Sequence, residues 1–248
     1  MATADPKTAL KALYDKESEL NAQWERDIHE ARKKHYEHNK AFYQRRAELA
    51  TGWSGDTQTH HAPIVDFWLT ALRKEHEIRK LVTKPDLGPL KSLIDIRIEW
   101  LEGFDYVLVF HFAPNEYFTN RVMRKEFYYE KTAEPTGEPS PLEMRGDRIH
   151  WKKNHILQAE CHARIGTRSF FAFVSRSLVY GDAQTAEEET AEDARMMEDF
   201  EMGESIRDCV QPYALDFSSK VFGVEGNTQG EEDENVEEDE EESDDMDW

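Results

Sequence analysis

The chain has 248 residues, 33% of them charged, a formal net charge of −21 and only two cysteines, Cys161 and Cys209. Two cysteines are too few for a disulfide scaffold, and no apolar run approaches the roughly 18 residues that a membrane span requires. We therefore expect a soluble intracellular protein with no membrane partner.

The negative charge is concentrated toward the C-terminal end. Residues 1–181 contain 28 Lys and Arg against 26 Asp and Glu, whereas residues 182–208 contain 2 against 11. Residues 231–248 contain 13 Asp and Glu and no Lys or Arg. An electrically balanced body with an acidic end favours a cationic partner.

Residues 7–50 lack Gly and Pro and are rich in good helix formers, which predicts one long helix. Unbroken, this helix would extend about 66 Å, and no later helix has the length to cover its apolar stripe. We therefore expect the stripe to pair with a second copy of the chain, as in a coiled coil. The alternative is a single helix docked on its own domain. The expected dimerisation residues are Leu10, Leu13, Leu20, Trp24, Ile28 and Ala31.

After a polar break at residues 51–56, the spacing of apolar residues predicts a short helix over Pro63–Leu72. Another helical turn is expected around Ile78–Val82, ended by Pro85 and Gly88-Pro89. Alternating or continuous apolar patterns then predict four strands, at Leu93–Trp100, Phe104–Phe112, Val122–Tyr129 and Arg148–Lys152. Strands that follow one another without helical crossovers favour an antiparallel sheet.

Residues 132–141 are expected to be a loose connection, and 183–194 an exposed one. Helices are predicted over Arg168–Tyr180 and over Met196–Phe217, the second kinked at Pro212. From Gly226 onward the chain has almost nothing to bury, which predicts disorder. The expected α+β protein thus has a dimerisation helix over residues 1–52, an α/β domain over 53–223 and an acidic tail over 224–248.

No motif in the sequence points to catalysis, a metal or a cofactor. The chain has no nucleophile elbow and no phosphate-binding loop, and CxxC or HxxxH spacing is missing around His60, His61, His155, Cys161 and His162. The basic residues 32–34 lie among glutamates, as on the solvated face of a long helix. We expect neither an enzyme nor a protein that binds DNA sequence-specifically.

The acidic tail carries the sharpest signal. Its charge comes mainly from Glu231, Glu232, Asp233, Glu234, Glu237, Glu238, Asp239 and Glu240. A tail that only solubilises the protein has no use for Met246 and Trp248, whose apolar side chains are costly to leave in water. We therefore hypothesise that the tail neutralises Lys and Arg on a basic protein and also fills an apolar niche there.

Several segments, in the same order, resemble motifs of one family. Residues 63–72 are similar to its I-P-[DE]-F-W-L-T-A segment, and 115–118 with 125–127 to its N-P-Y-F…K-E-[FY] run. Residues 169–173 and 203–208 also have counterparts, the latter near G-E-x-I-[RK]-D-D. Over residues 10–217 the chain resembles the nucleosome assembly protein family of histone chaperones. Glu116 stands where many members have Pro, Cys209 stands where Asp is frequent, and the short 51–62 segment is closer to the SET-like branch.

The resemblance implies an antiparallel dimer with an α/β "earmuff" at each end, a four-stranded antiparallel sheet with helices beneath. It further implies that core histones bind the acidic underside of the earmuff with assistance from the tail. We expect this exchange of charge contacts to need no ATP and to take place in nucleus and cytoplasm. An alternative is an acidic inhibitor or adaptor, as SET-like members are for a phosphatase. With the tail residues above, the expected histone-binding residues are Glu187, Glu188, Glu189, Glu192, Asp193, Glu198, Asp199, Glu201 and Glu204.

Overall fold

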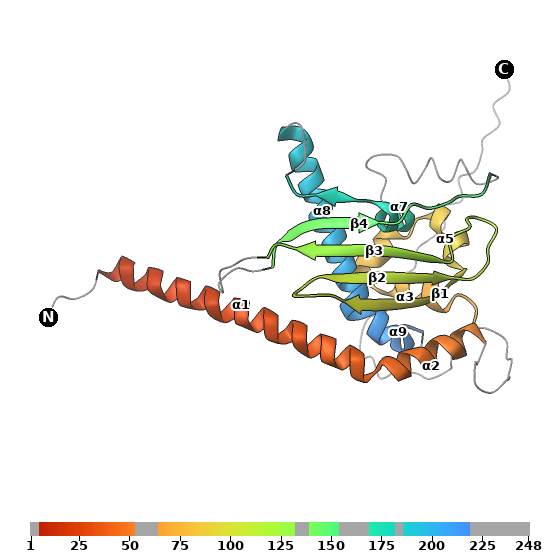
Figure 1. Ribbon diagram of the computed structural model, residues 1–248, viewed down its shortest axis with the longest axis horizontal. Coiled ribbons are helices and arrows are strands. Elements are labelled where there is room, and N and C mark those ends of the chain that lie inside the picture. The colour runs from red at the N-terminus through yellow and green to blue at the C-terminus, as the bar shows by residue number, and fades with distance from the viewer. Residues whose placement is uncertain (1–4, 53–63, 132–138, 154–168, 182–185, 219–248) are drawn as a thin grey trace, which may run out of the picture.

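The computed structural model describes residues 5–52, 64–131, 139–153, 169–181 and 186–218. A long N-terminal helix extends away from a body in which a sheet lies over a layer of helices (Figure 1). The helices are α1 (Pro6–His38), α2 (Lys40–Thr51), α3 (Phe67–Lys74), α4 (His76–Leu81), α5 (Lys84–Leu90), α7 (Phe170–Ser175), α8 (Ala186–Ser205), the π-helical η2 (Ile206–Val210) and α9 (Gln211–Phe217). The strands are β1 (Leu93–Trp100), β2 (Tyr106–Phe112), β3 (Val122–Tyr129), β4 (Pro141–Gly146) and β5 (Leu178–Val179).

The long helix is confirmed, but its unbroken course to Ala50 is wrong. The backbone leaves helical geometry at Asn39, with φ −94° and ψ 5°. The Asn39 side-chain amide donates to the carbonyl of His35 at 2.8 Å, a local bond of the kind that competes with helix continuation. Helix α2 therefore takes a new direction, which carries Tyr43 and Arg46 into contact with the body (Figure 1).

The sheet is antiparallel, in the order β1-β2-β3-β4-β5. The α+β class and the first three strands are confirmed, and the described residues form five strands in place of the expected four. The strand expected at Arg148–Lys152 is wrong, because this segment forms only an isolated bridge between Trp151 and Phe118. The fourth strand instead begins at Pro141, within the expected connection, at a first-residue position where a strand tolerates proline.

Several helix boundaries also differ from the sequence expectations. Helix α7 ends at Ser175 and the chain then forms β5, so the helix expected to reach Tyr180 is too long. Helix α8 already begins at Ala186, within the expected exposed connection. Helix α3 begins at Phe67, after Asp66 at φ 57°, and Pro63 lies outside the described residues.

Helix α5 runs through the prolines that were expected to end the preceding helix. Pro85 occupies its first turn, where a missing N–H costs nothing. The Asp86 carboxylate accepts a hydrogen bond from the Thr83 backbone N–H at 2.8 Å, completing a capping box. The expected helix over Met196–Phe217 is confirmed in three consecutive pieces, with non-helical geometry at Tyr213, directly after Pro212.

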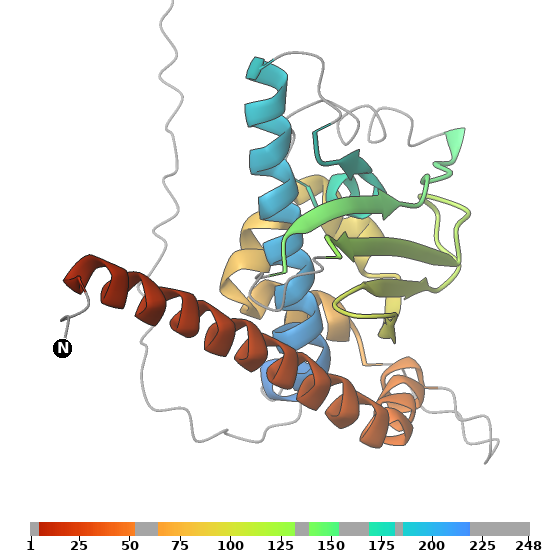
Figure 2. The same cartoon turned by 60° about the vertical axis from the view of Figure 1, so that its left-hand side comes forward.

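Aromatic side chains fill the layer between the sheet and α8. Phe127 stacks on Tyr106 with ring centroids 4.8 Å apart and meets Phe200 of α8 edge-on at 5.1 Å. Gly203 permits this approach, because a Cβ atom there would lie 2.4 Å from the Phe127 ring. The column formed by α8, η2 and α9 is thereby fixed behind the sheet, and α1 crosses its C-terminal part (Figure 2).

Candidate functional site

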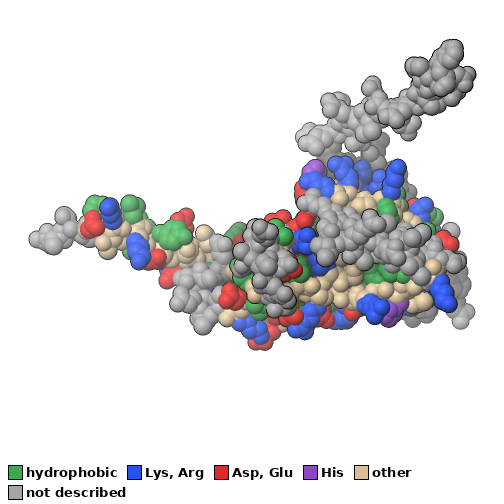
Figure 3. All heavy atoms as spheres, turned by 90° about the horizontal axis from the view of Figure 1, so that it is seen from above, with side chains coloured by type: hydrophobic (Ala, Val, Ile, Leu, Met, Phe, Trp, Pro, Cys, Tyr) green, Lys and Arg blue, Asp and Glu red, His purple; other side chains and the backbone are tan. Residues whose placement is uncertain are grey.

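The first feature is an apolar stripe on α1 that nothing in the described chain covers. Leu10, Leu13, Leu20 and Trp24 are 66%, 67%, 59% and 63% exposed, and Ala31 is also exposed. Ile28 is half-buried, so it is partly covered by its own body. Figure 3 shows hydrophobic side chains on the part of the helix that projects beyond the body. The structure therefore places five of the six expected dimerisation residues on a free surface and Ile28 at its edge.

A second face of α1 packs against its own body. Ala22, His29 and Tyr36 are buried and recur every seven residues. At 100° per residue, this face lies about 145° around the helix from the exposed stripe. Helix α1 thus has one face that packs against the body and a second, apolar face that the described chain leaves exposed.

Polar bonds fix the direction of α1 relative to the body. The Tyr36 hydroxyl accepts the Ile98 N–H at 3.0 Å, and Lys33 Nζ donates to the Leu101 carbonyl at 3.1 Å. In α2, Arg46 Nη1 donates to the carbonyl of Gln211 at 2.6 Å.

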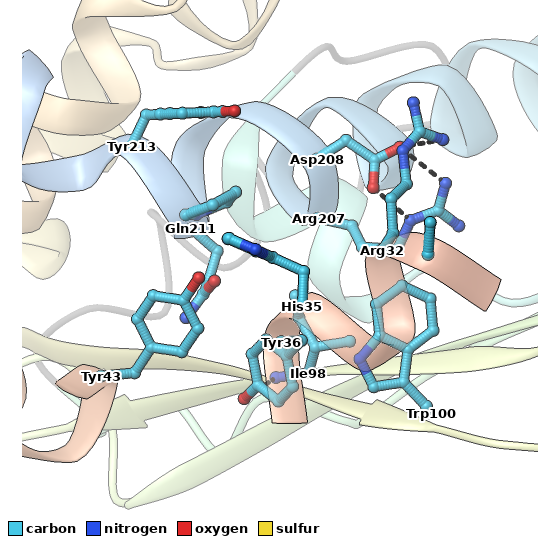
Figure 4. Close-up of a pocket in the computed structure, with 12 residues that line it drawn as sticks. Arg32, His35, Tyr36, Tyr43, Ile98, Trp100, Arg207, Asp208, Gln211 and Tyr213 are labelled. Carbon is cyan, nitrogen blue, oxygen red and sulfur yellow. Dashed lines mark hydrogen bonds and ion pairs between the residues drawn. The ribbon is translucent and has the colours of Figure 1, made fainter. Parts of the chain in front are cut away.

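Next to these bonds lies an open cavity of about 470 Å³. It is lined by residues of α1, α2, β1, η2 and α9 (Figure 4). Both amide atoms of Gln211 and Nε1 of Trp100 are buried without a hydrogen-bond partner among the described residues. His35 and Ala31 also line this cavity, and Ala31 belongs to the exposed stripe as well. The side chains of Gln211 and Trp100, with polar atoms that lack hydrogen-bond partners among the described residues, thus lie beside the surface that a second chain would cover.

Arg207 is the central charge of this junction. Its guanidinium lies 4.4 Å from the ring centroid of Tyr106 and 5.7 Å from that of Trp100. It forms two bonds of 2.8 Å to Asp208, which also pairs with Arg32 at 2.9 Å. Burial alone would lower the pKa of Arg207, but the bonds to Asp208 and the neighbouring Tyr106 raise it above its ordinary value. The side chain is therefore a permanent cation.

His29 packs beside this cation. Its ring meets Trp100 edge-on with centroids 5.1 Å apart. Burial, reinforced by the positive charge of Arg207, lowers the pKa of His29 from 6.5 to about 4. The imidazole is therefore neutral at physiological pH.

The second candidate surface is a groove of about 480 Å³ between α4 and α8. Its floor is apolar, with Leu81 and Met202 buried and Met197 50% exposed. Its walls carry three carboxylates and two cations, from Glu77, Glu198, Glu201, Lys80 and Arg195. An apolar floor with an acidic rim can hold an aliphatic or aromatic side chain while attracting neighbouring Lys or Arg.

The structure brings some of the expected acidic residues together on α8. Glu192, Asp193 and Glu198 are half-buried and Glu201 is exposed. Glu204 is half-buried and accepts the Tyr129 hydroxyl proton at 2.7 Å. Glu187, Glu188 and Glu189 lie in the first turns of α8, where the structure describes the backbone alone. The tail positions Glu231–Glu240, Met246 and Trp248 lie outside the described residues.

Asp199 requires a correction, because it is 2% exposed and bonded within the core. Its carboxylate contacts Lys125 Nζ at 3.4 Å and Arg176 Nη1 at 2.7 Å. Burial raises the pKa of Asp199 and lowers that of Lys125 to about 8, while each charge counteracts the shift of the other. This carboxylate holds α8 on the sheet and is not available to a partner.

Sequence reasoning overlooked Lys125 and the groove floor. Lys125 lies between Met123 and Phe127 on the inward face of β3, so the two-residue period already places it inside. Leu81 and Met197 are far apart in the sequence and no pattern joins them. In the part of the chain that the structure describes, no three His, Cys, Asp or Glu residues are arranged to hold a metal ion. None of the described helices is long and apolar enough to cross a membrane.

Comparison with known proteins gives a consistent picture. The family model described as nucleosome assembly protein (NAP) matches residues 7–220. A putative nucleosome assembly protein of Schizosaccharomyces pombe is 28% identical over 243 residues, covering 84% of this chain and 64% of the relative. Nucleosome assembly protein 1;3 of Nicotiana tabacum is 29% identical over 241 residues, covering 83% and 62%. The chain thus spans less than two thirds of the length of these two relatives.

Solved structures agree with this result. A malaria parasite nucleosome assembly protein is 26% identical, with a TM-score of 0.58 over 89% of this chain and 98% of that one. Nucleosome assembly protein 1 from Plasmodium knowlesi is 25% identical, with a TM-score of 0.59 over 88% and 97%. Vps75, at 16% identity and a TM-score of 0.53 over 87% and 99%, shares the fold.

Proposed function

The chain belongs to the nucleosome assembly protein family, and from this premise we propose that it is a histone chaperone acting as a homodimer. In this proposal it binds basic core histones through acidic surfaces of the body and through its acidic tail. It promotes nucleosome assembly and disassembly in the nucleus and accompanies histones in the cytoplasm. It is not an enzyme and uses no ATP.

The observation that carries the proposal is the groove between α4 and α8. Exposed Glu201 and half-buried Glu198 lie beside the exposed Met197, over the buried Leu81 and Met202. Carboxylates on the rim attract Lys and Arg from a distance, and the apolar floor adds short-range contact once a partner is seated. Glu192 and Asp193 lie earlier on the same helix and add two half-buried carboxylates to its negative charge.

Such a surface can promote assembly by competition alone. Histones attract DNA phosphates so strongly that direct mixing at low salt traps wrong complexes. A chaperone that occupies their basic groups with many weak, screened contacts exchanges rapidly and is displaced only by better-formed histone–DNA contacts. In this scheme Met246 and Trp248 of the tail add apolar contact to its charge.

The exposed stripe of α1 supports the proposed dimer. Four large apolar side chains, each more than half exposed, lie on a helix that projects from the body. A second α1, packed antiparallel along this stripe, would bury them and would also close the junction cavity at its Ala31 and His35 edge.

The groove is tested by charge reversal with a matched control. One variant changes Glu192, Asp193, Glu198 and Glu201 to Lys; the control changes Asp15, Glu30, Glu116 and Glu130, all exposed and elsewhere, to Lys. Both variants raise the net charge by the same amount. A difference in histone affinity between them therefore reports the position of the charges and not the overall charge of the protein. We expect the groove variant to bind H2A–H2B or H3–H4 at least about tenfold more weakly than the control at physiological salt.

Equal affinities of the two variants would show that only overall charge matters, and the groove would no longer support the proposal. The activity itself is tested by nuclease digestion of plasmid mixed with histones and the wild-type protein. Regularly spaced protected lengths, formed without ATP, are expected. Their absence at every ratio of protein to histone would contradict the chaperone function.

A further inference from the structure

A positively charged surface lies on the helices of the body, in a chain whose net charge is −21. It consists of the exposed side chains of Arg73, Lys74, Arg79 and Lys84, here called the basic surface. These residues end α3, lie in α4 and begin α5, three short helices that follow one another and are in contact. Figure 3 shows Lys and Arg side chains gathered on the part of the body that lies behind the sheet in Figure 1.

The four cations of the basic surface have no carboxylate within ion-pair distance among the described residues, because the nearby acids are otherwise engaged. Glu75 accepts the Ile78 N–H at 2.6 Å, and Glu77 pairs with Lys80 at 2.7 Å. Asp86 is buried at the cap of α5. In contrast, cations on the sheet are paired, as in Arg145–Glu143 at 2.6 Å and Arg124–Glu99 at 3.0 Å. The basic surface is therefore a concentration of uncompensated charge.

The described chain ends near this surface, twelve residues before the acidic run begins. Ser218, the last described residue, is buried and its hydroxyl donates to the carbonyl of Phe67 at 3.4 Å. Phe67 begins α3, and Arg73 and Lys74 end it, about 12 Å away along eight residues. Lys91 also lies next to Phe67, where its Nζ is 3.9 Å from the carboxylate of Asp66.

The linking segment is long enough to reach. Residues 219–230 separate Ser218 from the first residue of the acidic run, and 12 extended residues span about 40 Å at most. The run itself, 231–248, contains 13 Asp and Glu and no Lys or Arg. Tethering places this polyanion near the surface at an effective concentration in the millimolar range.

We propose that the basic surface binds the acidic tail, residues 231–248, of the same chain. Charge complementarity selects the tail over an external polyanion, because DNA approaching this surface must also approach a protein of strong negative charge. The docked tail lies beside the groove between α4 and α8, since Lys80 and Leu81 of α4 line that groove.

A regulatory consequence follows, and it rests on the proposed function. A histone seated in the groove would draw the neighbouring tail off the basic surface and onto itself. The tail would then bind the histone only after the body has bound it. Free chaperone would keep its tail away from other basic proteins.

Zero-length carbodiimide cross-linking of the full chain tests the contact directly, because it joins carboxylates to adjacent lysines. We expect cross-links from residues 231–247 to Lys74 and Lys84, decreasing about tenfold between 0.05 and 0.5 M salt as the Debye length shortens. When 15N-labelled and unlabelled protein are mixed, the cross-linked peptides should be uniformly labelled or unlabelled, as expected for one chain. Predominantly mixed pairs would overturn the same-chain assignment.

A variant and its control sharpen the test. In R73Q/K74Q/R79Q/K84Q, cross-links from the tail to the remaining Lys80 and Lys91 should decrease at least about fivefold at low salt. The control K7Q/K11Q/K34Q/R121Q removes the same charge from exposed sites elsewhere and should keep them. All changed side chains are exposed, so both variants are expected to fold.

Three further results would overturn the proposal. Tail cross-links could be spread evenly over exposed lysines, including Lys7 and Lys34, or could persist unchanged in the basic-surface variant. The tail could also form no cross-links while a short DNA duplex binds through the same four residues, which would identify a nucleic-acid contact. Because cross-linking needs no histone, loss of the tail contact with histone binding intact would refute this inference and leave the chaperone proposal standing.

Discussion

Helices α1 and α8 are both long and highly charged, but the body uses them in opposite ways. Helix α8 buries Met196 and Phe200 beneath the sheet, and it leaves the carboxylate of Glu201 exposed and that of Glu198 partly exposed. Helix α1 buries one face and leaves a second apolar face in water. Uncovered apolar area calls for another apolar surface, whereas uncovered negative charge calls for a cation. The two helices therefore point to two different partners, a second chain for α1 and a basic protein for α8.

The largest expected effect comes from placing charge in the exposed stripe. L20D/W24D would bury four uncompensated carboxylates at a symmetric seam, so dimer affinity should decrease more than about 1,000-fold, on the order of 4 kcal/mol. The control A12D/Q23D adds the same charges to exposed positions of α1 away from the stripe. Light scattering at micromolar concentration should show monomer for the first variant and dimer for the second. Dimers in both would mean that the chains do not associate through this stripe.

A second prediction concerns the contact that holds α8 on the sheet. Lys125→Met removes one partner of a buried ion pair and should lower the free energy of unfolding by about 3 kcal/mol. The double variant K125M/D199L removes both charges and leaves Arg176, which is partly exposed, free to reach water. It should recover at least half of that loss in urea unfolding at a fixed protein concentration. Strictly additive losses would show that Lys125 and Asp199 are not coupled.

The junction between α1 and the body should depend on pH through His29. Its folded pKa of about 4 lies below the unfolded value of 6.5, so the unfolded chain takes up the proton first as pH falls. The free energy of unfolding should therefore decrease between pH 6.5 and 4, by about 2 kcal/mol after allowance for solvent screening. H29F keeps an aromatic ring against Trp100 and should lose this part of the pH dependence. An unchanged profile in H29F would assign the dependence to other groups.

The smallest expected effect tests the apolar part of the groove. Met197→Ala should weaken histone binding only about threefold, through lost apolar contact. Because salt does not screen that contact, the factor should be the same at low and high salt, in contrast to charge reversal of Glu198 and Glu201. Titrations at two salt concentrations decide this. If the loss of histone affinity in Met197→Ala disappeared at high salt, Met197 would act only through the charges around it.

Local patterns anticipated the elements whose partners are adjacent in the sequence. The two-residue period of β1 and the aliphatic and aromatic content of β2 and β3 were sufficient, because each strand pairs with the next. The same reasoning failed for β4 and β5. The β-rich residues around Trp151 were expected to form the fourth strand. The strands that pair next to β3 are instead Pro141–Gly146 and Leu178–Val179, and the residue patterns of these two segments do not indicate strands.

The candidate site was predictable where exposure follows from periodicity. The stripe from Leu10 to Trp24 was visible because no later helix could cover it. Asp199 was misassigned because its neighbours Glu198 and Glu201 face outward, and only the packed structure shows Lys125 and Arg176 converging on it. The groove floor forms only because α4 and α8 lie side by side. The sequence does not show that these two helices are close in space.

The central claim is that the exposed stripe of α1 is covered by a second copy of this chain. Sedimentation equilibrium of the unmodified 248-residue chain, at micromolar concentration and physiological salt, tests it most directly. The account predicts a mass of twice the 29.0 kDa of one chain. A mass of 29.0 kDa throughout the micromolar range would contradict it, and Leu10, Leu13, Leu20 and Trp24 would then need another partner.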